Sequence, residues 1–488
     1  MSAKQPSTWT KTIVASMTSY IDAGSIVAGA AGLTLWEAYL NMADWQVGLL
    51  GAVSSNAISA AIGALIGGYI CDRYGRKLVY TYDLLFYIIG MLFIVFGVNY
   101  PMLLVGYCIV GLSVGADVVA SWTLIAENAP AENRARHCGT AQFMWALGPA
   151  MVLLVSVALS FALSDPVKDK QLQGLQDRER TFKTQIAAVK KESPQNEAKI
   201  EQLQAELAPV QAERVSLGKE LAEKYLPGNR IVFGHLIVIA FITWIMRLRM
   251  PESESWVASK EKEQELVAQG IWHKPKMSDL FFGPNLKGIL FLIGVYTIWN
   301  LAAGTMGFFL PYLYEKAGDG AVTTMTAQAL SVLLFVVSCF STLLIFMSLA
   351  DKYSRRMIYF VIACLFIAGW GLFLLPQSYM GMTVFIMIAV LIGINNGSGQ
   401  QAFYQIWGSE LFPARYRASA QGFLFFAARI CLGVWSVFVP IIYHRCGLQV
   451  AALFLVAFAT ISMIIGTVFC PNTAGKTLEQ IEKERYGT

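Results

Sequence analysis

Charged residues are scarce in this sequence, since only 14% of its 488 residues are Asp, Glu, Lys or Arg, whereas 56% are hydrophobic. A soluble globular protein carries about 25% charged residues, and a disordered chain is poor in apolar and aromatic side chains. Histidine occurs 4 times, and the 8 cysteines stand singly, without a CxxC pair or a Cys/His cluster. These absences argue against a soluble fold, a disordered chain, a disulfide framework and a metal centre. We expect no cofactor.

Long apolar runs fill most of the chain instead. A membrane-spanning helix needs about 20 mostly apolar residues. Twelve stretches meet this requirement, near 12–36, 46–70, 78–98, 102–126, 138–163, 231–249, 286–313, 326–349, 357–376, 380–408, 419–442 and 449–470. The first is longer than a signal-peptide core and has no cleavage pattern behind it, so we expect it to be retained. The sequence therefore predicts an all-α membrane protein with twelve transmembrane helices.

Lysine and arginine are concentrated in alternate connections between these stretches. The basic connections are short and contain residues 73–77, 134–136, 247–249, 352–356 and 415–417. The positive-inside rule places them, together with both termini, in the cytoplasm. The net charge of +5 thus reflects membrane topology rather than nucleic-acid binding.

One external segment, residues 165–230, differs from the other connections because it holds 12 Lys/Arg and 11 Asp/Glu. Its apolar residues recur at helical spacing: Leu172, Leu175, Phe182, Ile186 and Val189, then Ile200, Leu203, Leu207, Val210, Leu217 and Leu221. Ser193-Pro194 separates the two sets, and Pro209 is a candidate kink in the second. This pattern predicts two amphipathic helices in an antiparallel hairpin. The hairpin could be a solvated spacer or a docking arm for an external protein.

The two halves of the chain repeat short polar motifs. The segment 68–77 is echoed by 350–356, Glu127 to Arg136 by Glu410 to Arg417, and 251–253 by 471–473. A parallel repeat of six-helix halves is typical of secondary transporters. We therefore divide the chain into an N-terminal half (1–249, including 165–230 between its fifth and sixth helices), a cytoplasmic linker (250–283), a C-terminal half (284–470) and a cytoplasmic tail (471–488).

These motifs resemble those of a known family. DRYGRK at 72–77, the repeated Glu–Pro–Arg segments, PESESW at 251–256 and PNTAGKTLEQIE at 471–482 are similar to the signatures of the major facilitator superfamily, specifically its sugar porter branch. The resemblance covers the chain except the insertion. It implies a twelve-helix transporter that works by alternating access, with cytoplasmic charge clusters that latch the two halves together.

The resemblance also implies which residues form these clusters. One cluster would contain Asp72, Arg73, Arg76, Glu127 and Arg136, and the other Asp351, Arg356, Glu410 and Arg417. The alternative is that the basic residues act only as topological signals.

Ionisable residues at membrane depth are functional candidates, because placing a charge there is costly. Asp22 lies near the middle of the first predicted span, and Arg429 lies about as deep in the eleventh. The stretch around Asp22 resembles the helix-1 segment of sugar porters whose aspartate couples protons, although a permanent pair with Arg429 is the alternative. Asp117 resembles a helix-4 aspartate of phosphate and organic-acid symporters and is a second candidate for proton coupling. Asp83 is close enough to a helix end to reach the headgroup region.

The resemblance places the substrate site on the C-terminal half. The expected residues are Arg429, Tyr404, Asn300, Asn395, Asn396, Gln400, Gln401 and Trp299. Amides and an aromatic ring suit a sugar, and the glycines near Asn395 would let the tenth helix bend. Arg429 occupies a position where sugar porters carry a glutamine, and a guanidinium is suited to an anion. This change favours an anionic substrate, such as a sugar acid or small organic acid. If an aspartate neutralises Arg429, a neutral sugar or polyol would still be allowed.

The sequence thus predicts a proton-coupled importer of a small polar solute, with a sugar acid, small organic acid or sugar as substrate, in a bacterial inner membrane. Its partners would be the solute, protons and the lipid bilayer. The alternatives are a facilitator or symporter of neutral sugars or polyols, a proton-driven exporter, and a non-transporting nutrient sensor that signals through the hairpin or residues 250–283. An enzyme is not expected, because no nucleophile–base pair or phosphate-binding loop is present.

Overall fold

The computed structural model describes residues 6–53, 57–192, 197–270, 276–318, 322 and 324–487. The N-terminal half contains α1 (Thr8–Leu40), α2 (Asp44–Ala52), α3 (Ile58–Tyr74), α4 (Arg76–Val95), α5 (Tyr100–Asn128), η1 (Ala131–Asn133), α6 (Arg134–Leu163), α7 (Pro166–Glu192) and α8 (Glu197–Leu248). The linker contains α9 (Glu254–Ala268) and η2 (Met277–Phe281).

The C-terminal half begins with α10 (Gly283–Leu292), the π-helical turn η3 (Ile293–Thr297), α11 (Ile298–Ala317), α12 (Thr324–Ser341), the π-helical turn η4 (Thr342–Phe346) and α13 (Met347–Leu349). It continues with α14 (Arg355–Gly371), η5 (Leu372–Leu374), η6 (Gln377–Tyr379), α15 (Met382–Ser398), α16 (Gln400–Glu410), α17 (Arg417–Cys446), α18 (Leu448–Val468) and α19 (Leu478–Tyr486).

The predicted twelve-span, all-α fold is confirmed. Within the described ranges, eleven helices are long and apolar enough to cross a membrane. The remaining predicted span, 46–70, corresponds to α2 and α3, which flank residues 54–56 outside the described part. The sixth predicted span is the C-terminal part of α8, which continues from the hairpin without interruption.

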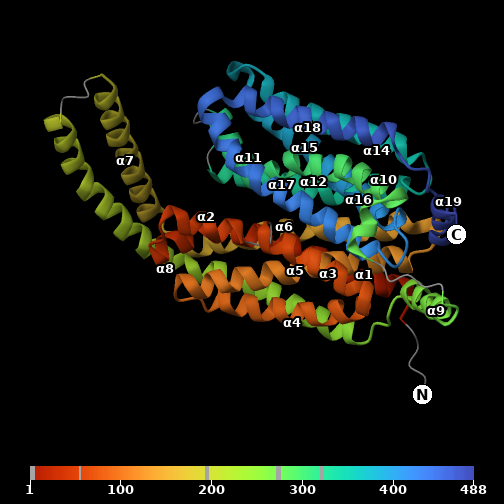
Figure 1. Cartoon of the computed structure of the whole chain (residues 1–488). Coiled ribbons are helices and arrows are strands. Elements are labelled where there is room, and N and C mark those ends of the chain that lie inside the picture. Colours follow the sequence, from red (N-terminus) through yellow and green to blue (C-terminus); the bar gives the residue numbers. More distant parts are fainter. Residues whose placement is uncertain are drawn as a thin grey trace.

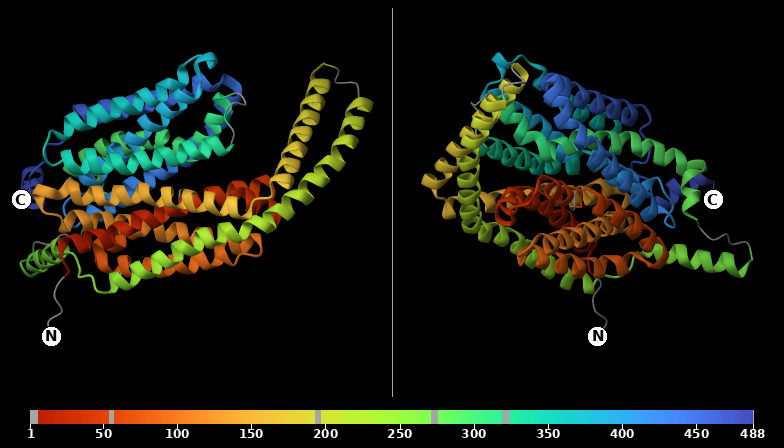
Figure 2. Two further views of the ribbon diagram at one scale, coloured as in Figure 1. Left: turned by 180° about the vertical axis from the view of Figure 1, so that it is seen from behind. Right: turned by 60° about the vertical axis from the view of Figure 1, so that its left-hand side comes forward.

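The two halves lie side by side as two helical layers (Figures 1 and 2). The hairpin of α7 and α8 projects from one end of the bundle, called here the hairpin end. The start of α1, α19 and α9 lie at the opposite end, called here the basic end because the arginine-rich connections gather there (Figures 1 and 2). α3 packs against α17 and α6 against α12, and these pairs join the two halves.

Glycine allows the α3–α17 pair to approach closely. A Cβ atom at Gly68 would lie 2.4 Å from the carbonyl oxygen of Ala418, and one at Gly422 would lie 2.3 Å from that of Ala64. Small residues at such crossings bring helix backbones together and are typical of membrane proteins. This contact fixes the position of α17 beside the N-terminal half, and α17 carries Arg429.

The predicted hairpin is present. Its apolar residues form two small clusters, one with Leu175, Val210, Leu217 and Leu221 at its centre, the other with Ile186, Leu203 and Leu207. The remaining predicted apolar residues, Leu172, Phe182, Val189 and Ile200, pack against these clusters. The predicted break at Ser193-Pro194 lies outside the described residues. α8 remains helical through Pro209.

Candidate functional site

A cavity lies between the two halves, midway along the helices. Its walls come from α1 and α6 on one side and from η3, α11, α12, α15, α16 and α17 on the other. The lining residues are Ala23, Ile26, Val27, Trp145, Pro149, Tyr296, Trp299, Asn300, Ala303, Gly304, Met306, Phe335, Asn396, Gln401 and Arg429. We call it the central cavity.

Five predicted substrate-site residues line this cavity: Trp299, Asn300, Asn396, Gln401 and Arg429. The other three, Tyr404, Asn395 and Gln400, are buried behind its wall. The structure therefore brings most of the predicted set together and assigns the rest a supporting position.

The buried amides are connected by hydrogen bonds. The indole N–H of Trp299 donates to Asn395 Oδ1 at 3.1 Å, and Asn395 Nδ2 donates to Gln400 Oε1 at 2.7 Å. Asn395 thus orients Trp299 from behind rather than contacting a solute. Asn396 Nδ2 donates to Ser338 Oγ at 3.0 Å, whereas its Oδ1 has no hydrogen-bond partner among the described residues. That oxygen is an acceptor available to a solute hydroxyl.

A break between α15 and α16 positions these amide side chains. α15 ends at Ser398 and α16 begins at Gln400, with Gly399 between them in a non-helical conformation (φ −95°, ψ −143°). A Cβ atom at Gly399 would lie 2.3 Å from Asn395 Nδ2, so a side chain does not fit there. The bend predicted from the glycine-rich sequence is therefore present, and it allows Asn396 and Gln401 to line the same cavity.

Among the described residues, the tyrosine ring that lines the cavity is that of Tyr296 rather than that of the predicted Tyr404. The two rings are stacked, with centroids 3.8 Å apart and planes 9° apart, and Tyr404 lies behind Tyr296. The hydroxyl of Tyr404 donates to the carbonyl oxygen of Gln421 at 3.3 Å. Sequence analysis missed Tyr296, although its spacing of three residues from Trp299 places both on one helix face.

Two opposite charges lie at the level of the cavity, one from each half. Asp22 on α1 is 1% exposed, and the side chain of Trp145 interacts with its carboxylate. Arg429 on α17 attracts this carboxylate electrostatically, and its guanidinium lies 4.6 Å from the centre of the Phe425 ring. A buried carboxylate at membrane depth is a candidate for exchanging a proton.

Asp117 has a different environment. It forms two hydrogen bonds with Arg247, from Nη1 at 3.0 Å and from Nη2 at 2.9 Å, and Ser121 donates to it as well. Arg247 is fully buried, lies over the Tyr80 ring and also pairs with Asp83 at 3.3 Å. Such a bidentate pair fixes the positions of both side chains and joins α5 to α8.

This cluster corrects two expectations. Asp83 does not reach the headgroup region, because its side chain is buried inside the N-terminal half. Arg247 is not a loop arginine, because α8 extends to Leu248 and carries the guanidinium between α4 and α5. The geometry favours a structural role for Asp117, and its role in proton coupling stays a prediction.

At the basic end, one charge cluster joins the halves around Glu127. Arg76 and Arg417 both donate to Glu127 Oε1, at 3.0 and 2.7 Å, so this carboxylate bridges α4 and α17. Asp72 accepts the backbone N–H groups of Ala418 at 3.2 Å and Ser419 at 2.7 Å. A carboxylate in this position caps the N-terminus of α17 and interacts favourably with the helix dipole.

The internal repeat produces the same cluster around Glu410. Arg134 donates to Glu410 at 2.8 Å and Arg355 at 3.0 Å, so Glu410 also bridges the halves. Asp351 accepts the backbone N–H groups of Ala135 at 3.0 Å and Arg136 at 2.9 Å, capping α6.

Three of the predicted arginines differ from this arrangement. The side chain of Arg73 is exposed and donates to Tyr69 instead. Arg136 contributes only its backbone N–H, and Arg356 is exposed. The arginines that fill the second cluster are Arg134 and Arg355, which sequence analysis did not select. Arg417 was assigned to the cluster of its own half but pairs with Glu127 of the other half.

Comparison with known proteins agrees with this fold. The family model of the sugar (and other) transporters matches residues 15–203, and that of the major facilitator superfamily matches residues 225–436. The chain is 47% identical over 479 residues to the minor myo-inositol transporter IolF of Bacillus subtilis, covering 98% of this chain and 94% of that protein. The chain belongs to the sugar porter branch of the major facilitator superfamily. It is therefore a multi-pass membrane transporter and not an enzyme.

More distant relatives share the fold. The glucose transporter GlcP of Staphylococcus epidermidis is 23% identical over 447 residues, covering 88% of this chain and 87% of that protein. A solved structure of the proton:xylose symporter XylE bound to 6-bromo-6-deoxy-D-glucose matches with a TM-score of 0.73 at 16% identity, covering 98% of this chain and 99% of that one. This sugar porter thus has the architecture of a known symporter.

Proposed function

We propose that this sugar porter imports a neutral polyhydroxylated solute, a cyclic polyol of the myo-inositol type, together with protons. The observation that carries the proposal is the lining of the central cavity, where Asn300, Asn396 and Gln401 offer amides beside the rings of Tyr296 and Trp299. Amides pair with vicinal hydroxyl groups, and aromatic rings pack against the apolar face of a sugar or cyclitol. The 47% identity to a protein named as a myo-inositol transporter supports this substrate class.

Arg429 does not require an anionic substrate in this proposal. It lines the cavity, yet Asp22 attracts it electrostatically and the Phe425 ring lies against its guanidinium. The charge of Arg429 is therefore balanced from within the protein, and a neutral solute leaves no unpaired charge. A sugar acid remains the competing substrate, because it could take the place of Asp22 beside Arg429.

Asp22 is the proposed proton site. It lies on α1 in one half and Arg429 lies on α17 in the other, so the attraction between them favours approach of the halves at the cavity. Protonation removes this attraction. The charge state of Asp22 would thereby couple proton binding to the relative position of the halves, which is the requirement for symport.

The membrane orientation follows from the charge distribution. We propose that the basic end faces the cytoplasm, with both termini there, in agreement with the positive-inside rule. The two clusters around Glu127 and Glu410 hold the basic end closed. The structure then corresponds to a state in which the central cavity is approached from the external, hairpin end. A docking role of residues 165–230 for an external protein and the domain boundaries given above stay predictions.

The substrate class is tested by uptake into proteoliposomes of radiolabelled myo-inositol, with unlabelled sugars, polyols and sugar acids as competitors. We expect neutral polyols to compete and sugar acids not to. Arg429→Gln should weaken the coupling between proton and solute uptake, and neutral polyols should remain preferred over anions. Arg356→Gln is the matched control, because it removes the charge of an exposed arginine. Uptake of a sugar acid that depends on Arg429 would replace the neutral substrate with an anion.

A further inference from the structure

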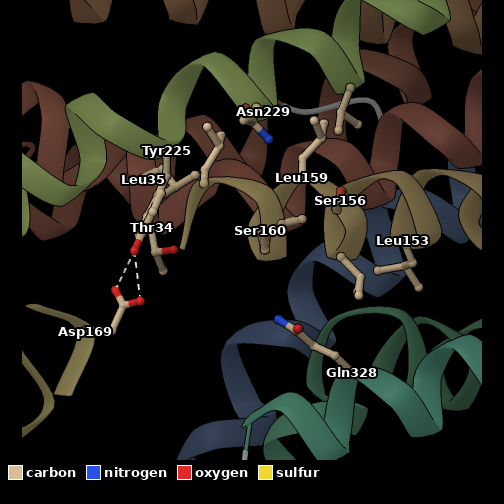
Figure 3. A pocket seen from close by; sticks show the side chains of 15 residues that line it. Thr34, Leu35, Leu153, Ser156, Leu159, Ser160, Asp169, Tyr225, Asn229 and Gln328 are labelled. Atoms are coloured by element: carbon tan, nitrogen blue, oxygen red, sulfur yellow. Dashed lines mark hydrogen bonds between the residues drawn. The ribbon is translucent and has the colours of Figure 1, made fainter. Parts of the chain in front are cut away.

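A second cavity lies beyond the central one, towards the hairpin end. The central cavity is lined by residues 23–27 of α1, 145–149 of α6 and Phe335 of α12, and the second by 31–35 of α1, 153–163 of α6 and Gln328 of α12. At 1.5 Å per residue the second lies on the order of 10–15 Å further along the same three helices. We call it the outer cavity (Figure 3).

The outer cavity is lined by hydroxyl, amide and carboxylate groups. Thr34, Ser156, Ser160 and Asn229 come from the N-terminal half, and Gln328 comes from the C-terminal half. None of the lining residues in the described part of the chain is Lys, Arg or His. A solute in this cavity would meet donors and acceptors for hydroxyl groups and no cation that could attract an anion.

Two of these polar groups have unsatisfied hydrogen-bonding capacity. Asn229 is only 7% exposed, yet its Oδ1 has no hydrogen-bond partner among the described residues, and its Nδ2 makes one long bond, at 3.4 Å, to the carbonyl oxygen of Ala28. The buried Oγ of Ser156 also has no partner within the described ranges. Figure 3 shows Asn229 pointing from α8 into the cavity. A buried polar group without a partner costs free energy, which a ligand hydroxyl would recover.

The base of the hairpin completes the cavity wall. Tyr225 donates to both carboxylate oxygens of Asp169 at 2.8 Å (Figure 3). The backbone N–H of Asp165 donates to the Tyr225 hydroxyl at 2.9 Å. Lys224 pairs with Asp165 at 3.0 Å. These bonds fix the start of α7 against α8, so that Asp169 lies at the rim as a negatively charged acceptor. The insertion, residues 165–230, thus supplies four lining residues, Asp169, Tyr225, Gly228 and Asn229.

We propose that the outer cavity is a first binding site for a neutral polyhydroxylated solute on its way to the central cavity, and that the hairpin forms part of it. This inference rests on the proposed function, because it uses the same substrate class. It also strengthens the choice of a neutral solute, since Asp169 repels anions at the entrance. The hairpin accordingly contributes to solute binding and is more than a solvated spacer.

The test separates the two cavities by labelling. In a Ser160→Cys variant, a membrane-impermeant maleimide reacts with the new thiol at the rim of the outer cavity. Mass spectrometry of the peptide that contains position 160 measures the labelling of this thiol separately from that of the native cysteines. With myo-inositol at twice its dissociation constant, the labelling rate should fall to about one third, because the free fraction of the site falls by that factor. Gln202→Cys, on the exposed hairpin surface, is the control and should react at an unchanged rate.

The decisive variant adds Asn300→Ala, which removes an amide of the central cavity. Protection of Cys at position 160 that persists in this background supports the outer site, and Gln328→Ala should then reduce it. Protection that disappears with Asn300→Ala, or its absence in a protein that transports myo-inositol, overturns the outer site. Protection without any transport of polyols leaves the outer site intact and refutes the proposed function. Loss of both protection and transport refutes both.

Discussion

The arginines Arg134 and Arg136 at the start of α6 allow a direct test of how the basic end is held closed. Arg134 is 2% exposed and donates to Glu410 of the C-terminal half at 2.8 Å and to the carbonyl oxygen of Lys476 at 3.1 Å. The side chain of Arg136 is exposed. Arg134→Gln and Arg136→Gln each remove one positive charge from the same turn, but only the first breaks a buried ion pair that bridges the halves.

The expected magnitude follows from this burial. Removing one partner of a buried ion pair costs about 3–5 kcal/mol. The lower end applies here, because Glu410 keeps its bond to Arg355 at 3.0 Å. Since each 1.4 kcal/mol is a factor of ten, about 3 kcal/mol shifts the equilibrium between the closed and the open basic end by roughly 100-fold. Arg136→Gln should leave this equilibrium near that of the unmodified protein, because a surface charge contributes little.

Hydrogen–deuterium exchange of the protein in nanodiscs measures this shift. The peptides to follow contain Glu410 and the start of α6 at Arg134, where the cluster joins the halves. Arg134→Gln should accelerate exchange in both peptides by up to roughly 100-fold, the expected shift in the opening equilibrium. Arg136→Gln should not change the exchange rate. Equal exchange in the two variants would refute the assignment of Arg134 to the latch.

Three further outcomes are expected. Asp117→Asn should lower the unfolding temperature in detergent by several degrees, because it weakens a buried ion pair, whereas Asp22→Asn should abolish proton-driven accumulation with little loss of stability. Tyr296→Ala should raise KM for a polyol in uptake assays, since this ring lines the cavity. The hydrogen bond from Lys224 lowers the pKa of Asp165. The contribution of Asp165 to hairpin stability is therefore complete above about pH 4, its ordinary pKa, and is lost as the pH falls through the lowered value. Circular dichroism during acid titration measures this loss, and Asp165→Asn should make the acid transition of the hairpin smaller.

The fold could be predicted from the sequence because its signals extend over many residues. Apolar runs, basic connections and the internal repeat each report the same twelve-helix arrangement, and helical spacing identified the apolar residues between α7 and α8. These patterns depend on residue type alone and tolerate an error of one position.

The choice between neighbouring residues could not be predicted in the same way. Arg134 and Arg136, or Arg355 and Arg356, are equivalent in a motif, yet each residue turns the side chain by about 100° around a helix. The caps formed by Asp351 at α6 and by Asp72 at α17 set the helix phase, and they depend on contacts between the halves.

The substrate site shows the same limit. The glycine-rich stretch revealed that the helix breaks near Gly399, but not that Tyr404 would stack behind Tyr296. The π-helical turn at 293–297 adds to this difficulty, because it changes the phase of the residues that follow, including Trp299. The positions inferred by resemblance therefore lie either at the central cavity or one layer of side chains behind it.

Proton movement during polyol uptake tests the central claim most directly. Proteoliposomes carrying an internal pH dye should acidify when myo-inositol is added outside, and Asp22→Asn should abolish this signal while solute exchange at equal concentrations continues. Uptake of myo-inositol without acidification, or acidification that is unchanged in Asp22→Asn, would contradict proton coupling at Asp22.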